Sequence, residues 1–137
     1  MKLLILLSFT CVVVACSNSK HAAGYSSKLN GTWLPVKEEI AGKPIPAAGF
    51  QTQKLVVKDT SYTFTAESVD KGSIQYKDGK MDIYGRDGVN AGKHFTAIYK
   101  LEDGQLSICY NLAGTNYPEA YDTKGRPLYF ACVFKKQ

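Results

Sequence analysis

Short runs of alternating apolar and polar residues, separated at regular intervals by turn residues, constrain the fold of this 137-residue chain most strongly. The runs are rich in β-branched and aromatic residues and recur roughly every ten residues, which is typical of antiparallel strands. Asp-Gly pairs between them favour tight hairpins, because both central turn positions take positive φ. We expect eight strands, in TWLPVKEEI, KLVVKD, YTFTAES, GSIQYK, KMDIYG, HFTAIYKL, QLSICYNL and PLYFACVFK. We expect turns at residues 59–61, 70–72, 78–79, 87–88 and 103–104.

Alternation places the apolar side chains of each run on one face. The residues expected on the buried face are Leu55, Val57, Tyr62, Phe64, Ile74, Tyr76, Met81, Ile83, Phe95, Ala97, Tyr99 and Leu101. Antiparallel strands with one buried face, and no long amphipathic helix to cover them, favour a closed sheet. The sequence therefore predicts an all-β domain, an eight-stranded up-and-down antiparallel barrel. One or two short helical turns are expected, in PIPAAGFQ and NYPEAYDT.

The first 15 residues have the pattern of an export signal. Lys2 precedes the apolar run LLILLSFTCVVVA, which ends in the small residue Ala15 and is shorter than the about 20 residues of a membrane span. The sequence VVAC at residues 13–16 resembles the lipobox of bacterial lipoproteins, in which the cysteine becomes the first mature residue and carries acyl chains. The resemblance implies cleavage after Ala15 and a lipid anchor on Cys16, since stable attachment needs two or more chains. Ordinary secretion with an unmodified Cys16 is the alternative.

Residues 16–28 are small and polar, and we expect them to form a flexible tether to one domain at residues 29–137. Lipoproteins kept in the inner membrane commonly carry Asp after the cysteine, whereas Ser17 stands here, which implies the outer membrane. The acidic run of some surface-exported lipoproteins is missing from SNSKHAAGYSSK, so we favour the periplasmic face. The net charge is +5 but the lysines are scattered, and nucleic acid is not an expected partner.

The start of the domain is similar to that of lipocalins and other calycins. LNGTW, residues 29–33, matches the Gly-x-Trp opening of their first strand, in which the Trp closes one end of the barrel. The domain also resembles a bacterial lipocalin-like family of unknown function, abundant in planctomycetes, through LNGTW, GKPIP, KLVVK, KMDIYG, AIYKLEDGQLSICY and YPEAY. The resemblance implies a lipocalin-like barrel that Trp33 closes. Calycins often place an Arg across this Trp, and Arg126, ahead of PLYF, is the candidate for that role.

The sequence offers no catalytic or metal-binding pattern. His21 and His94 have no second ligand at metal spacing, and neither H-E-x-x-H nor C-x-x-C occurs. GRDGVNAGKH does not fit a phosphate loop, since Asp87 replaces its first Gly, so a long hairpin loop is the better interpretation. The adjacent Glu38 and Glu39 point to opposite faces of a strand and cannot cooperate. We expect no enzymatic activity, no cofactor and no metal.

The direction of Glu38 depends on strand parity. Glu38 has the same parity along the strand as the apolar residues Leu34, Val36 and Ile40, so regular alternation would turn its side chain into the barrel. A bulge near Pro35 would reverse that assignment, and an exposed Glu38 is the favoured interpretation.

Cys109 and Cys132 remain in the mature chain, in a compartment that would allow a disulfide. They lie on the last two strands, but their parities do not agree. Two buried free thiols are the favoured interpretation, and a disulfide is the alternative.

Two functions are compatible with the sequence. The first is a non-catalytic cell-envelope lipoprotein whose barrel binds a small amphipathic or hydrophobic ligand. Its candidate ligand-binding residues are Tyr62, Phe64, Tyr76 and Tyr99, since tyrosine offers an apolar body with a polar tip. The alternative is an interaction module that docks onto an outer-membrane protein complex or inhibits an envelope enzyme. The interior volume separates the two, and the bulky inward Tyr and Phe residues favour a narrow or absent cavity.

Overall fold

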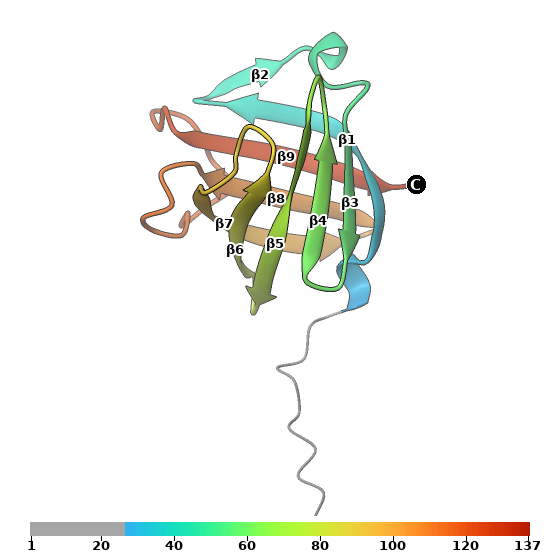
Figure 1. Ribbon diagram of the computed structural model, residues 1–137. Helices are drawn as coiled ribbons and strands as arrows, with labels where there is room; N and C mark the ends of the chain where they lie inside the picture. Colours follow the sequence, from blue (N-terminus) through green and yellow to red (C-terminus); the bar gives the residue numbers. More distant parts are fainter. Residues whose placement is uncertain (1–26) are drawn as a thin grey trace, which may run out of the picture.

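The computed structural model describes residues 27–137, which form a closed antiparallel barrel (Figure 1). Its strands are β1 (Gly31–Ile40), β2 (Lys43–Ile45), β3 (Lys54–Lys58), β4 (Ser61–Thr65), β5 (Val69–Lys77), β6 (Lys80–Asp87), β7 (His94–Glu102), β8 (Gln105–Asn111) and β9 (Tyr129–Lys136). The order β1-β3-β4-β5-β6-β7-β8-β9 returns to β1 because β1 also pairs with β9. Eight strands therefore form the predicted up-and-down barrel, and β2 is a short arm on the far end of β1.

Two short 3-10 turns accompany the strands, η1 (Ser27–Leu29) and η2 (Ala47–Gly49). The second confirms the helical turn expected in PIPAAGFQ, whereas NYPEAYDT forms no helical turn. The predicted signal peptide, Cys16 and most of the tether lie outside the described residues. Within residues 27–137, no helix is both long enough and apolar enough to cross a membrane.

The hairpins explain why all eight predicted strands are present. At residues 78–79 and 103–104 both turn residues have positive φ: 51° and 78° for Asp78 and Gly79, and 50° and 74° for Asp103 and Gly104. This is the geometry of a type I′ turn, whose twist matches that of antiparallel strands. The turn predicted at residues 70–72 is wrong, since these residues lie inside β5. The arm β2 was not predicted.

The inside of the barrel forms the core, and the predicted inward face is confirmed. Fully buried members of that face are Leu55, Val57, Tyr62, Ile74, Tyr76, Met81, Ile83 and Ala97. Phe64, Phe95, Tyr99 and Leu101 are partly buried and pack against them.

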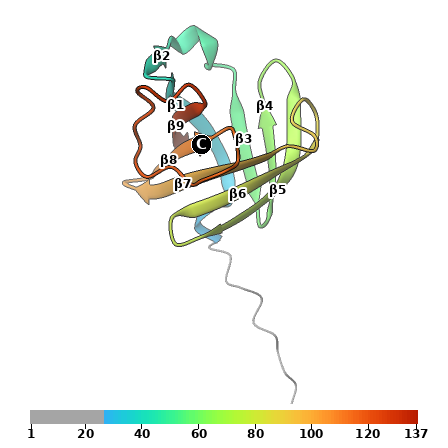
Figure 2. The same cartoon turned by 90° about the vertical axis from the view of Figure 1, so that its left-hand side faces the viewer.

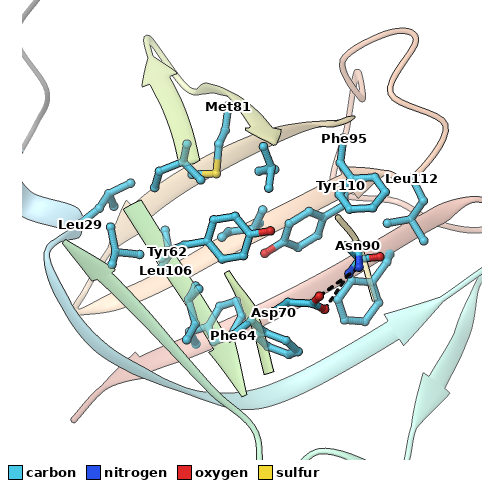
Figure 3. A pocket seen from close by; sticks show the side chains of 17 residues that line it. Leu29, Tyr62, Phe64, Asp70, Met81, Asn90, Phe95, Leu106, Tyr110 and Leu112 are labelled. Carbon is cyan, nitrogen blue, oxygen red and sulfur yellow. Dashed lines mark hydrogen bonds between the residues drawn. The ribbon is translucent and has the colours of Figure 1, made fainter. Parts of the chain in front are cut away.

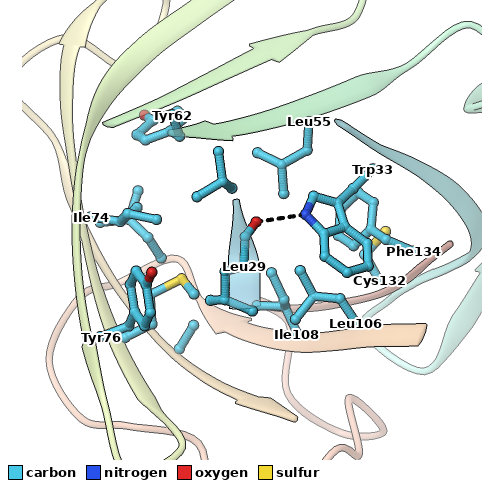
Figure 4. Close-up of a cluster of buried hydrophobic side chains, with 14 residues drawn as sticks. Leu29, Trp33, Leu55, Tyr62, Ile74, Tyr76, Leu106, Ile108, Cys132 and Phe134 are labelled. Carbon is cyan, nitrogen blue, oxygen red and sulfur yellow. Dashed lines mark hydrogen bonds between the residues drawn. The ribbon is translucent and has the colours of Figure 1, made fainter. Parts of the chain in front are cut away.

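Trp33 and η1 lie together at one end of the barrel, which we call the closed end (Figure 4). Trp33 is only 1% exposed, and its indole N–H donates a hydrogen bond of 2.8 Å to the carbonyl oxygen of Leu29. The ammonium group of Lys136, the register partner of Trp33 on β9, lies 5.3 Å from the centre of the indole ring. The cation across Trp33 is therefore Lys136 and not Arg126. Arg126 precedes β9 at the opposite end, where its guanidinium lies 5.1 Å from the Tyr129 ring.

Residues 112–128 connect β8 to β9 and form a strap along the outside of the barrel (Figure 2). The hydroxyl of Thr96 on β7 donates a hydrogen bond of 2.7 Å to the carbonyl oxygen of Asn116 in the strap. Farther along the strap, Thr123 donates a hydrogen bond to Glu39 on β1 and accepts one from the backbone N–H of Gly42. These bonds fasten the strap to β7 at one point and to β1 and the β1–β2 turn at another.

The two cysteines lie on opposite faces of the sheet. Cys109 on β8 faces Ala131 on β9, whereas Cys132 faces Ile108, so the parities of the two cysteines differ by one residue. Both are buried free thiols, which confirms the favoured interpretation. Burial raises the pKa of the Cys109 thiol to about 11, and this thiol stays protonated at neutral pH.

Replacement of Trp33 by Ala should lower the free energy of unfolding by about 3–5 kcal/mol, because it removes a large buried side chain and the bond to Leu29. Urea denaturation measures the change. The control is Leu34→Ala, since Leu34 is exposed on the same strand and its loss should cost under about 1 kcal/mol. Equal effects of the two substitutions would contradict a closing role for Trp33.

Candidate ligand-binding cavity

The barrel contains a cavity of about 150 Å³ (Figure 3). Its deep part, toward η1, is lined by the buried side chains of Leu29, Val57, Ile74, Met81 and Leu106. At the other end, which we call the loop end, it is lined by Phe64, Phe95, Leu112 and Phe130. These four are only partly buried, so the cavity opens at the loop end. The narrow interior expected from the sequence is thus present as a small apolar cavity.

Two tyrosine hydroxyls converge inside this cavity. Tyr62 comes from β4 and Tyr110 from β8, and Figure 3 shows their hydroxyl groups directed toward one another. Tyr62 is 8% exposed, and neither hydroxyl has a hydrogen-bond partner among residues 27–137. Burial raises the pKa of both phenols, and the charge of Asp70 adds to the shift of Tyr62. At neutral pH both are therefore O–H groups that can donate to a ligand or accept from it.

Gly72 allows the Tyr62 ring to take this position. The two residues are register partners on β4 and β5. A Cβ atom at position 72 would lie 2.6 Å from the ring carbon Cε1 of Tyr62 and 2.1 Å from the carbonyl oxygen of Tyr84. Only glycine avoids both contacts, which explains a glycine in the middle of a strand.

Asp70 contributes a buried carboxylate to the cavity wall. It is 6% exposed, and both of its oxygens accept hydrogen bonds from Asn90 in the loop between β6 and β7. The Asn90 backbone N–H donates to Oδ1 at 3.0 Å and its amide Nδ2 to Oδ2 at 2.8 Å. Gly88, with φ of 95°, lets this loop approach, because a Cβ there would lie 2.4 Å from Oδ1 of Asp70. The loop thus fixes the carboxylate without neutralising its charge.

Glu38 is the second carboxylate on the inside of the barrel. A register shift between Pro35 and Lys37 marks a bulge in β1, so Leu34 faces outward while Glu38 faces inward. Glu38 is 2% exposed, and the exposed interpretation is wrong. Its Oε1 lies 3.7 Å from the Sγ of Cys132, and burial raises the pKa of its carboxyl group. The charge of Glu38 also contributes to the raised pKa of Tyr110.

The cavity includes two of the four ligand-binding residues expected from the sequence. Tyr62 and Phe64 line it. Tyr76 and Tyr99 do not, and their rings instead form an edge-to-face pair with centroids 5.7 Å apart.

Sequence reasoning missed Asp70, Asn90 and Tyr110 as cavity residues. Alternation could have identified Tyr110, since it has the same parity as the apolar residues Leu106 and Ile108 in QLSICYNL. Asp70 gave a misleading signal, because Asp-Lys-Gly is typical of a turn. Asn90 is placed by a loop, which alternation does not describe.

A second polar cluster lies on the outer surface of β6 and β7. The imidazole Nε2 of His94 lies 2.8 Å from Oδ1 of Asp82, and the Tyr117 hydroxyl donates a hydrogen bond to the same carboxylate. This hydrogen bond raises the pKa of Tyr117 to about 12. Because Tyr117 belongs to the strap, the cluster fastens the strap to β6.

Comparison with known proteins does not assign the cavity a ligand. No family model matches the chain, and no curated protein matches it. Among residues 27–137, no group of three or more His, Cys, Asp or Glu side chains is arranged to hold a metal ion. The inference of function therefore rests on the cavity itself.

Replacement of Glu38 by Gln should stabilise the protein at pH 7.5 and have little effect at pH 4. Burial raises the pKa of Glu38 in the folded state. The neutral carboxyl therefore contributes its full share to the stability of the folded protein below the unfolded-state pKa of about 4.5. This stability is lost as the pH rises, because the buried group must then ionise. Gln keeps the neutral shape at every pH. Urea denaturation at the two pH values measures the difference, with the exposed Glu67→Gln as control. A Glu38→Gln protein no more stable than wild type at pH 7.5 would contradict this account.

Proposed function

We propose that this chain is a non-catalytic cell-envelope lipoprotein whose lipocalin-like barrel binds a small amphipathic or hydrophobic ligand. The observation that carries the proposal is the apolar cavity with two unpaired tyrosine hydroxyls inside it. Small-molecule sites are typically apolar and contain a few convergent polar groups.

The size of the cavity limits the buried part of the ligand. A volume of 150 Å³ is comparable with that of an engineered apolar cavity that takes up benzene. The buried part therefore has the bulk of one aromatic ring or a short alkyl chain. Since the cavity opens at the loop end, a larger ligand extends past Leu112 and Phe130.

The relationship to lipocalins is part of the proposal. It is supported by the closed eight-stranded barrel and by Trp33 at its closed end. Lys136 lies over Trp33, where calycins often place an Arg, and it supplies the same positive charge.

The proposed lipid anchor gives the cavity an orientation. The chain enters the barrel through η1 at the closed end, opposite the opening of the cavity (Figure 1). Eleven residues, 16–26, precede η1, and a flexible chain of that length reaches on the order of 20 Å. An anchor on Cys16 in the outer membrane would hold the closed end near the bilayer and leave the loop end accessible from the periplasm.

A second candidate function is supported by exposed apolar residues at the loop end of the barrel, outside the cavity. Ile40, Val89 and Leu128 are large apolar side chains that are exposed at the loop end. Large exposed apolar side chains offer a surface on which a protein partner can dock. An envelope protein that docks at the loop end is therefore the alternative to a small ligand.

Benzyl alcohol and 1-hexanol should bind the purified protein saturably, because each has an apolar part that fits the cavity and a hydroxyl that can pair with the tyrosines. Calorimetric titration and NMR chemical shifts measure binding. Leu112→Trp fills the opening and should weaken binding at least tenfold. The matched control Leu128→Trp enlarges an exposed residue outside the cavity and should change affinity less than twofold. If neither compound gives a saturable signal in these titrations, ligand binding is contradicted and the docking function is the one that remains.

Replacement of Cys16 by Ser should abolish lipid attachment, because the serine hydroxyl does not replace the thiol as acceptor of the diacylglyceryl group. Partitioning of the protein expressed in a bacterial host between a detergent phase and water measures the effect. Wild type should enter the detergent phase and Cys16→Ser the aqueous phase. Cys11→Ser is the matched control and should behave as wild type, since Cys11 precedes the expected cleavage site. Wild type found in water would contradict the anchor.

A further inference from the structure

We propose that the ligand carries an amine group, which is held as a cation by Asp70 and the Tyr62 hydroxyl, with its apolar part deeper in the barrel. This inference rests on the proposed function and narrows it, because it excludes simple carboxylates such as fatty acids as preferred ligands. It follows from the distribution of charge between the inside and the outside of the barrel.

Asp70 is a buried charge without a cationic partner. Buried carboxylates are normally paired with a cation, because removal of the charge from water is costly. The ion pairs among the described residues are His94 with Asp82 and Lys100 with Glu102, and neither includes Asp70. Asn90 supplies two neutral hydrogen bonds to Asp70 but no charge.

Among residues 27–137, the inside of the barrel contains carboxyl groups but no Lys or Arg side chain. Asp70 and Glu38 are its buried carboxyl groups, and every Lys and Arg from residue 28 to residue 137 is exposed. A carboxylate that enters this space would meet like charge and no cation. A cation would meet opposite charge and the faces of aromatic rings, both of which attract it.

The hydrogen-bonding groups in the cavity suit an ammonium group. A carboxylate has about four acceptor positions, and Asn90 occupies one on each oxygen of Asp70. Tyr62 is 8% exposed as a residue, and its hydroxyl, for which no hydrogen bond is found among the described residues, points into the same cavity (Figure 3). Asp70 and Tyr62 line the same cavity, and the charge of Asp70 adds to the raised pKa of Tyr62. An ammonium has three donors, which can be shared between Asp70 and the oxygens of Tyr62 and Tyr110.

The position of Asp70 sets the direction of the ligand. Asp70 pairs with Phe64 near the loop end of the sheet, whereas Leu29, Val57 and Met81 line the deep end. The amine therefore stays near the opening, and the apolar part extends toward η1. An aromatic or short alkyl primary amine has this arrangement of polar and apolar parts.

The test compares three compounds with the same ring and different heads: benzylamine, benzyl alcohol and benzoate. Calorimetric titrations at pH 7 with the full-length purified protein should show benzylamine binding at least tenfold more tightly than benzoate. Asp70→Asn should weaken benzylamine about tenfold and benzyl alcohol less than threefold. Asp87→Asn is the matched control, because Asp87 is an exposed carboxylate at the same end of the barrel, and it should leave all three affinities within twofold.

The outcomes separate this inference from the proposed function. Benzoate binding as tightly as benzylamine, or an Asp70→Asn protein with unchanged benzylamine affinity, would overturn the amine and leave ligand binding intact. Failure of all three compounds to bind would overturn both. The wild-type comparison of benzylamine with benzoate decides the question even where Asp70→Asn does not fold. Tyr62→Phe then provides a second variant, which should weaken benzylamine severalfold.

Discussion

The pairing of β1 with β9 is the interaction on which the rest of this structure depends. It runs from Trp33 opposite Lys136 to Ile40 opposite Phe130 and turns an open sheet into a barrel without free edges along its wall. Closure requires β1 to bend, and the bulge between Pro35 and Lys37 supplies the bend. Because the bulge reverses alternation, it also turns Glu38 from the outer face to the interior. A buried carboxylate is thus a direct consequence of the way in which the barrel closes.

Local signals were enough to predict the barrel but not its polar interior. Asp-Gly pairs and alternation act within a few residues, so the eight strands and their inward faces could be identified from sequence. Asp70 and Gly72 were placed in a turn because both residue types favour turns locally. In the structure they belong to β5, since Gly72 accommodates the Tyr62 ring and Asn90, twenty residues away, binds Asp70. The residues on either side of Asp70 and Gly72 in the sequence do not reveal such long-range contacts. The bulge that turns Glu38 inward is likewise not visible in the alternation of β1.

The interior sacrifices stability to keep polar groups in place. A barrel of this size could be filled by aliphatic side chains, yet two carboxyls and two tyrosine hydroxyls lie on its inner surface. Asp70 is held by hydrogen bonds that fix its direction and leave its charge uncompensated. Such pre-organised but unpaired groups are typical of binding sites, where the ligand completes the pairing, and they are costly in a purely structural core. This contrast supports a small ligand over docking alone, although Ile40, Val89 and Leu128 are exposed at the same end of the barrel.

The two ends of the barrel are built differently, and the difference separates the part that sets the strand register from the part that lines the opening of the cavity. The closed end consists of η1, the Trp33 bond to Leu29 and tight hairpins such as those at residues 78–79 and 103–104. Changes there would alter strand register, because hairpin geometry fixes it. The loop end consists of longer connections, including residues 88–93 and the strap at residues 112–128, which can vary without disturbing the alternation of the strands. Asn90 belongs to the first of these connections and Leu112 to the second, and both line the cavity. The lining of the cavity can therefore change through its loops while β1, β9 and the closed end keep the barrel intact.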